Sequence, residues 1–251
     1  MCMSKLNKGL QVLVAGTCIN LTIGVLYAWS VIKKALVNDW GWTNTDASMP
    51  YNVAIVVWAV ALLIAGALQD RIGPKKVITL GVVLVGLGMI LSSMIPQDSV
   101  LGLTVAFGGV VGTGIGFAYA CVTPAAMKWF HPSKKGLVNG LVVAGFGLGA
   151  LWLAPLEIYF LKQLNWSLEK TLMTLGVLIL ILGTIAAFNV VNPPAGYKYP
   201  ELPVDPNKPV KENMKKSASI GLSTMVKQPQ TWMLFFVYAF YCSAGAMVIS
   251  N

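Results

Sequence analysis

A short charged link, Gly66–Lys76, joins two long apolar segments, Pro50–Leu68 and Val77–Ile95. Each segment approaches the roughly 20 residues that a helix needs to cross about 30 Å of hydrocarbon at about 1.5 Å per residue. A link this short cannot hold a domain of its own. The two segments are therefore expected to form neighbouring antiparallel helices in a membrane.

The residues of this link have distinct expected roles. Gly66 is expected to permit close contact between helices, and Gly73 with Pro74 is expected to force the turn. Asp70 is expected to pair with Arg71 or with the N–H groups that open the next helix. The link is therefore predicted to be a compact hairpin connection rather than a flexible loop.

The composition is that of a membrane protein. Hydrophobic residues make up 56% of the 251 residues and charged residues only 11%, whereas soluble domains carry about 25% charged residues. The net charge of +9 comes from lysines between the apolar segments, with no basic-aromatic recognition motif, so no nucleic-acid partner is expected. Positive loops beside anionic membrane lipid account for the charge better.

Catalytic and metal-binding patterns are absent from the sequence. The four cysteines lie far apart and mostly inside apolar segments, so they indicate small buried side chains rather than disulfides. The single histidine, His131, has no potential metal-ligand partners near it in the sequence. No catalytic dyad, phosphate loop or metal cluster is found. The sequence thus predicts no enzyme, no cofactor and no metal site.

The hydropathy pattern predicts seven membrane spans. Residues 1–191 are expected to form a six-helix transmembrane bundle, residues 192–228 a Pro-rich, basic cytoplasmic linker, and residues 229–251 one further transmembrane helix. The predicted spans are Leu10–Ile32, Pro50–Leu68, Val77–Ile95, Val100–Met127, Leu137–Phe160, Thr171–Val191 and Thr231–Ser250.

The distribution of lysine and arginine predicts the orientation. If the N-terminus is cytoplasmic, fourteen of the eighteen basic residues fall in cytoplasmic segments. The other four, Lys33, Lys34, Lys162 and Lys170, fall outside. This positive-inside bias predicts a multi-pass protein of the plasma (cytoplasmic) membrane with its N-terminus in the cytoplasm.

The first and fourth spans share a short internal repeat. Gly24–Ala28 (GVLYA) in the first span is echoed by Gly116–Ala120 (GFAYA) in the fourth, and these spans run in opposite directions, as inverted repeats require. The repeat places Tyr27 and Tyr119 inside the membrane, on opposite sides of its midplane. Like Asn20, each either bonds to a neighbouring backbone carbonyl or faces a wet cavity.

Charged side chains inside the spans are scarce. Glu157 lies near the outer end of the fifth span and is expected to be interfacial, not a proton carrier. No lysine, arginine or histidine lies deep in any predicted span. A positive charge that could bind an anion is therefore not expected from this chain.

The charged link resembles the signature Gly-x-Leu-x-Asp-Arg-x-Gly-x-[Arg/Lys]-[Arg/Lys] that lies between helices two and three of the major facilitator superfamily. This resemblance implies an all-α membrane fold, with a six-helix bundle of inverted three-helix repeats and one further transmembrane helix. It also implies that the link controls a conformational change through charge pairing at the helix ends. The residues that match the signature and would act as gating residues are Gly66, Asp70, Arg71, Gly73, Lys75 and Lys76.

Within that superfamily, the chain resembles the oxalate/formate antiporter family. The resemblance is carried by Ile23–Val31 in the first span, by Lys128–Gly149 between the fourth and fifth spans, and by Gln228–Trp232. It implies that Tyr27, Tyr119 and Phe146 line a substrate cavity.

Two departures from that family's pattern bear on the substrate. Leu26 stands where the family has a glutamine, and Phe146 stands where the oxalate carrier has a tyrosine. The family's basic substrate residues lie on later helices, beyond Asn251. The implied substrate is therefore a small carboxylate, with oxalate, formate and monocarboxylates such as pyruvate or lactate all open.

The implied function is alternating-access transport of that carboxylate between two helix bundles. Since the family has twelve spans and seven are predicted here, the chain is expected to be an incomplete carrier whose partners are the substrate anion, membrane lipid and a missing C-terminal bundle. Two alternatives are a seven-span protein that pairs with its own copy and a seven-span receptor or sensor. The long linker weighs against the first, and the inside N-terminus and the hairpin signature against the second.

Overall fold

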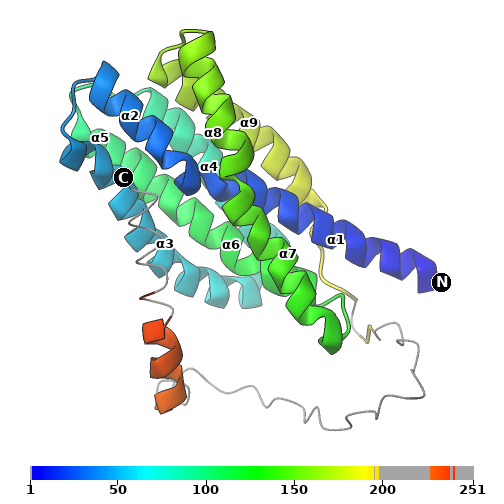
Figure 1. The fold of residues 1–251 in the computed structure, drawn as a ribbon. Helices are drawn as coiled ribbons and strands as arrows, with labels where there is room; N and C mark the ends of the chain where they lie inside the picture. Colours follow the sequence, from blue (N-terminus) through cyan, green and yellow to red (C-terminus); the bar gives the residue numbers. More distant parts are fainter. Residues whose placement is uncertain (1, 195, 198–226, 238–239, 241–251) are drawn as a thin grey trace. The chain divides into compact units, whose positions relative to one another are not determined.

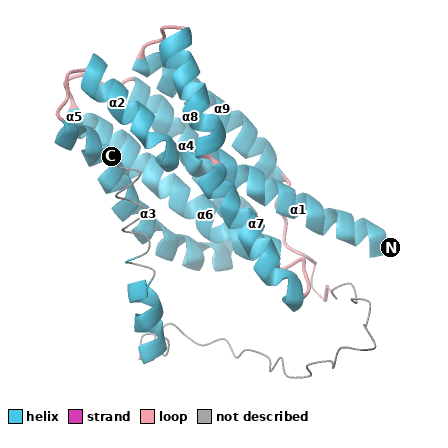
Figure 2. Cartoon of the chain, in the orientation of Figure 1, coloured by secondary structure: helices cyan, strands magenta, loops and turns pink. Residues whose placement is uncertain are grey.

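The structure is a computed structural model that describes residues 2–194, 196–197, 227–237 and 240. The chain divides into two compact units, Met1–Pro200 and Glu201–Asn251. All regular structure among the described residues is helical (Figure 2). Six helical segments in this part of the chain are long and apolar enough to cross a membrane, which confirms the all-α membrane fold.

The six spans follow one another through the first unit (Figure 1). Several are built from more than one helical segment, with a short 3₁₀ segment in span one and π-helical segments in spans four and five. The elements of spans one to three are α1 (Cys2–Ile23), η1 (Gly24–Ala28), α2 (Trp29–Asp39), α3 (Asn44–Ile72) and α4 (Pro74–Ser93). Those of spans four to six are α5 (Val100–Leu103), η2 (Thr104–Val111), α6 (Gly112–Met127), η3 (Pro132–Lys134), α7 (Lys135–Leu148), α8 (Ala150–Ile158), η4 (Tyr159–Gln163) and α9 (Leu168–Phe188).

Helix packing in the first unit has the symmetry of an inverted repeat. Span one packs on span five (α1 on α7) as span four packs on span two (α6 on α3). Span one also packs on span six (α1 on α9) as span four packs on span three (α6 on α4), and spans three and six pack on each other. Exchanging the first three spans with the last three leaves this set of contacts unchanged, as expected for inverted three-helix repeats.

Equivalent glycines permit close approaches in the two halves. A Cβ atom on Gly24 would lie 2.5 Å from the carbonyl oxygen of Phe146. A Cβ atom on Gly116 would lie 2.5 Å from the Cβ of Ala61 and 2.9 Å from the carbonyl oxygen of Trp58. Small residues let helix backbones meet where no hydrophobic force favours association within lipid. The repeated motif thus fixes the same helix–helix contact twice.

The charged link is shorter than the sequence predicts. Helix α3 continues to Ile72 and α4 begins at Pro74, so only Gly73 interrupts the two helices. Gly73 has a φ of +85°, which glycine adopts without strain, and its N–H donates to the carbonyl of Gln69 at 2.9 Å. The expected close helix contact at Gly66 is wrong, because a Cβ placed there would meet nothing within 4 Å.

The helices also extend beyond the predicted apolar spans. Helix α3 begins six residues before the predicted start because Thr43 caps it, accepting a hydrogen bond from the N–H of Asp46 at 3.1 Å. Lys33 and Lys34, expected in a loop, lie in α2. Polar residues outside a membrane can continue a helix, so the loss of hydropathy does not mark its end.

Parts of the predicted domain organisation lie outside the described residues. The linker prediction covers residues 192–228, of which 195 and 198–226 are not described. The seventh span was predicted over Thr231–Ser250, where the structure describes a helix over residues 229–237 and Phe240 alone beyond it. The orientation across the membrane stays a prediction from the lysine and arginine counts.

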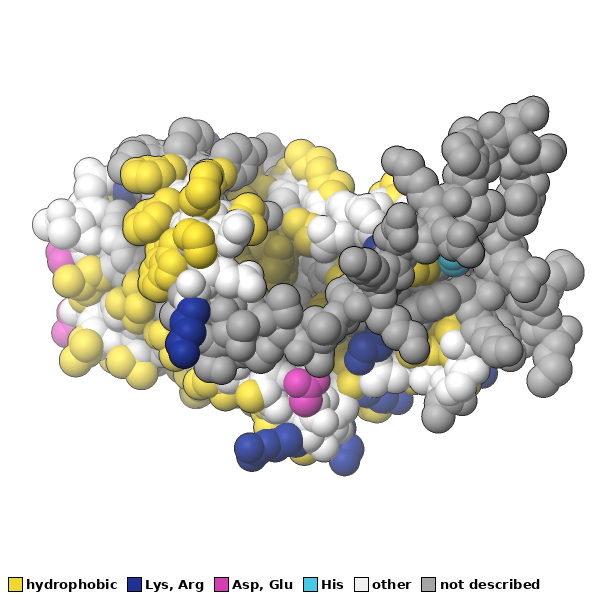
Figure 3. Space-filling model, turned by 90° about the horizontal axis from the view of Figure 1, so that it is seen from below, with side chains coloured by type: hydrophobic (Ala, Val, Ile, Leu, Met, Phe, Trp, Pro, Cys, Tyr) yellow, Lys and Arg dark blue, Asp and Glu magenta, His cyan; other side chains and the backbone are white. Residues whose placement is uncertain are grey.

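Large apolar side chains are exposed along the spans. Examples are Leu63 on α3, Leu151 on α8 and Ile185 on α9. Figure 3 shows apolar side chains gathered in broad patches on the face drawn. A surface of this kind is unfavourable in water and suits a bundle whose outer faces meet lipid or another helical bundle. The chain is therefore described as a multi-pass membrane protein.

Candidate substrate site

Four aromatic side chains from four different spans meet inside the bundle. The ring of Phe146 is at the centre, and the other rings surround it. Its centroid lies 5.3 Å from that of Tyr27, 5.3 Å from that of Trp58 and 5.0 Å from that of Tyr119. The rings of Trp58 and Tyr119 also meet edge to face, with centroids 5.6 Å apart. We call Tyr27, Trp58, Tyr119 and Phe146 the aromatic cluster.

The inverted repeat explains how the chain assembles this cluster. Tyr27 follows Gly24 by three residues, and Gly24 faces the backbone of Phe146. Tyr119 follows Gly116 by three residues, and Gly116 faces the backbone of Trp58. The cluster therefore consists of two related pairs, each made of one tyrosine and one aromatic partner without a hydroxyl group from the neighbouring span.

The structure brings together all three residues that the resemblance implied for the substrate cavity, and it adds Trp58. That tryptophan was missed because it lies in an ordinary apolar stretch of α3, where an indole is easily accommodated. The short repeat could have revealed it: if Gly116 in span four is the counterpart of Gly24, then span two must supply a counterpart of Phe146. The indole Nε1 of Trp58 is buried and has no hydrogen-bond partner.

The chemistry of the cluster suits a small polar molecule. Tyrosine and tryptophan offer O–H and N–H donors on apolar rings, and ring edges carry partial positive charge. Phe146 is 3% exposed, while Tyr27, Trp58 and Tyr119 are each partly exposed. The site thus has a buried central ring surrounded by three partly exposed side chains that carry hydrogen-bond donors.

Two polar residues of the predicted spans, Asn20 and Glu157, lie in different environments. Asn20 donates its side-chain N–H to the carbonyl of Val142 at 2.7 Å, so it ties α1 to α7 as a structural contact. Glu157 is 0% exposed, so other helices of the bundle enclose its carboxyl group, while its depth in the membrane stays a prediction. The helix of span five continues through η4 to Gln163, which places Glu157 well inside the helix rather than at its end.

The predicted gating residues lie at one end of the bundle, away from the aromatic cluster in sequence and structure. Asp70, Arg71 and Lys76 are exposed, and α4 begins without a side-chain cap hydrogen bond, so of the two expected roles of Asp70 only pairing with Arg71 stays a prediction. The ammonium of Lys75 lies 5.1 Å from the ring centroid of Phe188, which joins the start of α4 to the end of α9.

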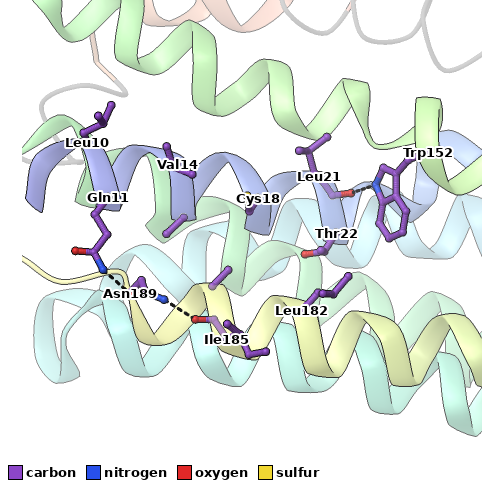
Figure 4. A pocket seen from close by; sticks show the side chains of 12 residues that line it. Leu10, Gln11, Val14, Cys18, Leu21, Thr22, Trp152, Leu182, Ile185 and Asn189 are labelled. Carbon is purple, nitrogen blue, oxygen red and sulfur yellow. Dashed lines mark hydrogen bonds between the residues drawn. The ribbon is translucent and has the colours of Figure 1, made fainter. Parts of the chain in front are cut away.

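A separate groove of about 820 Å³ lies between α1 and α9 (Figure 4). None of the residues that line it is charged, and polar contacts occur mainly at one end, where Gln11 donates to the side chain of Asn189 at 2.7 Å. The indole of Trp152 donates to the carbonyl of Leu21 at 3.0 Å on another side of the groove. An apolar groove without a charge is unsuited to an anion and does not contain any member of the aromatic cluster.

Comparison with known families decides the identity of the fold. The pattern of the Major Facilitator Superfamily matches residues 12–250. The chain belongs to the major facilitator superfamily. This membership agrees with the inverted repeat and places the chain among membrane transporters rather than enzymes. The part of the chain that the structure describes holds no group of three or more potential metal ligands.

Several curated proteins are similar to the chain in sequence. The chain is 26% identical over 240 residues to the uncharacterized MFS-type transporter YhjX of Escherichia coli, covering 93% of this chain and 54% of that protein. It is 23% identical over 252 residues to the oxalate:formate antiporter of Oxalobacter formigenes, covering 98% and 54%. Over 102 residues it is 37% identical to apicoplast pyruvate carrier 1 of Toxoplasma gondii, covering 41% and 18%. The chain spans about half the length of the curated relatives that it matches along most of its own length.

Proposed function

We propose that this major facilitator bundle forms one wall of a carrier for a small carboxylate, with the aromatic cluster as its side of the substrate site. The observation that supports this most is the convergence of four aromatic residues from spans one, two, four and five on one point. Relatives named for oxalate, formate and pyruvate support a small carboxylate as the substrate class.

Electrostatics argues that a second bundle completes the site. Burying a carboxylate without a positive charge costs several kcal/mol or more, because hydroxyl and indole donors compensate an anion only in part. All four members of the aromatic cluster are uncharged. We therefore propose that the counter-charge comes from a facing bundle and that transport proceeds by alternating access between the two.

Uptake into liposomes tests the proposal. The 251-residue chain is reconstituted alone and together with the C-terminal bundle of an oxalate/formate-type carrier, and uptake of labelled oxalate, formate, pyruvate and lactate is measured. We expect saturable uptake of at least one carboxylate only when both bundles are present. Failure of all four substrates with both bundles present would overturn the substrate class. Saturable uptake by the chain alone would instead favour pairing of two copies.

A gating role for the charged link predicts a separate kinetic effect. Asp70 and Arg71 lie at the end of α3, remote from the aromatic cluster, so they would stabilise one conformation of the carrier rather than touch the substrate. Asp70→Asn should slow turnover by about ten-fold, which corresponds to about 1.4 kcal/mol, with substrate affinity nearly unchanged. Initial rates and equilibrium binding measured on the same preparation separate the two quantities. Normal turnover with weakened binding would contradict this role.

A further inference from the structure

Glu157 in α8 is a buried carboxyl group that the proposed substrate site does not use. The side chain is 0% exposed, and neither Oε1 nor Oε2 has a hydrogen-bond partner. Buried carboxylates in proteins are almost always paired or hydrogen-bonded. An ionisable residue in a membrane helix is costly to bury and is retained mainly for function. Glu157 is therefore a candidate site for an ion.

The elements packed against α8 form no hydrogen bond with this carboxyl group. Helix α8 contacts η1, α2, α7 and η4. No side chain of these elements hydrogen-bonds to either oxygen of Glu157. The titratable groups that they carry are Tyr27 on η1, Lys33, Lys34 and Asp39 on α2, Lys135 on α7, and Tyr159 and Lys162 on η4. A carboxyl group that is buried without a hydrogen bond is accommodated better as a neutral acid than as a carboxylate.

The helix around Glu157 is irregular on both sides. Pro155, two residues earlier, lies inside α8 and has no N–H to donate to the preceding turn. The π-helical segment η4 begins at Tyr159, two residues later, and such segments often occur at functional sites. A helix that is weakened before and after one residue can shift locally and bring that residue to water.

We propose that Glu157 binds the proton to which transport is coupled. This proposal rests on the proposed carrier function. In the arrangement described here one carboxyl oxygen carries the proton. In another arrangement of span five the O–H bond breaks, the proton passes to water on the other side of the membrane, and the carboxylate becomes hydrated. A pH difference across the membrane would then drive uptake of the carboxylate substrate.

Infrared spectroscopy of the reconstituted 251-residue chain tests the proton site without any transport. At neutral pH the spectrum should contain the C=O stretching band of a protonated carboxylic acid, and Glu157→Gln should remove it. Glu169→Gln is the matched control, because Glu169 is partly exposed and accepts a hydrogen bond from Gln97 at 2.7 Å, so this change should leave the band in place. A band that survives Glu157→Gln would overturn the proposal.

Transport gives the second readout, in liposomes that contain both bundles. Glu157→Gln should abolish accumulation driven by a pH difference but preserve exchange of labelled for unlabelled substrate. Accumulation equal to that of the parent chain would overturn the proposal. Glu157→Leu, which has a side chain of similar size, should likewise abolish pH-driven accumulation and preserve exchange. This variant tests the proposal if Glu157→Gln does not fold. If no carboxylate is transported by the parent chain, the carrier function fails while the infrared result still decides whether Glu157 holds a proton.

Discussion

Gly24→Ala and Gly116→Ala should each destabilise the helix bundle strongly, whereas Gly140→Ala should not. A Cβ atom at either of the first two positions would lie about 2.5 Å from atoms of the neighbouring span, among them the carbonyl oxygen of Phe146. Backbone cannot move aside as the end of a flexible side chain can. Overpacking a core usually costs about 1–3 kcal/mol, and contact with backbone belongs at the upper end of that range.

Gly140 is the matched control for these substitutions. It is exposed on α7, and a Cβ placed there would meet nothing within 4 Å. Alanine at an exposed helix position is favoured over glycine by about 1 kcal/mol, so Gly140→Ala should hold or raise the Tm. Thermal unfolding in detergent compares the three variants. For a chain of this size, each kcal/mol of lost stability lowers the Tm by about 2–4 °C. Equal Tm values for Gly24→Ala and Gly140→Ala would refute the close contact between spans one and five.

The two glycine variants also test the inverted repeat itself. Gly24 and Gly116 are equivalent positions only if spans one and five pack as spans four and two do. Both substitutions should then lower the Tm by similar amounts, and each should separate a tyrosine from its aromatic partner. A strong effect at one position alone would mean that the two halves of the bundle are not equivalent in energy.

Much of the fold could be predicted from the sequence because membrane spans are long apolar segments, which the hydropathy of the sequence identifies directly. The fourth span shows this best, since the predicted segment, Val100–Met127, coincides with the observed one. Helix ends were less predictable where the chain leaves the membrane. At the charged link, the residues from Gln69 to Ile72 are polar enough to suggest a loop, yet they continue α3 because nothing in them breaks a helix before Gly73.

The aromatic cluster was predictable only in part. Tyr27 and Tyr119 could be found because a hydroxyl group inside an apolar span is unusual and because both follow a repeated glycine. Trp58 carried no such signal, since a tryptophan in an apolar helix is ordinary until its neighbours are known. Glu157 stands out in the sequence as a carboxyl group in a span, but its burial could not be predicted, because it depends on the elements that pack against α8.

Phe146→Ala should have the largest effect on both stability and substrate binding. The ring is 3% exposed and contacts the rings of Tyr27, Trp58 and Tyr119. Removing a buried phenylalanine ring costs about 3–5 kcal/mol, because the cavity that remains is filled only in part. The tyrosines would also lose the surface that positions them, so binding of any carboxylate substrate should fall below detection.

Phe146→Tyr separates the packing role of the ring from its part in substrate choice. The tyrosine keeps the ring and adds one hydroxyl donor, so the Tm should stay close to that of the parent chain. An added hydrogen bond to an anion is worth about 1.5–3 kcal/mol, so the affinity for oxalate, with its second carboxylate group, should rise by roughly ten-fold or more relative to pyruvate.

Tyr27→Phe and Tyr119→Phe are the complementary variants, since each removes one hydroxyl and keeps one ring. We expect them to weaken binding by a similar factor while leaving the Tm within a few degrees, because ring packing accounts for most of their buried contact. Equilibrium binding and thermal unfolding, measured on all four variants in the presence of the facing bundle, give the full comparison. If Phe146→Ala unfolds the chain but neither tyrosine variant alters binding, the cluster is a packing core and the substrate site lies elsewhere.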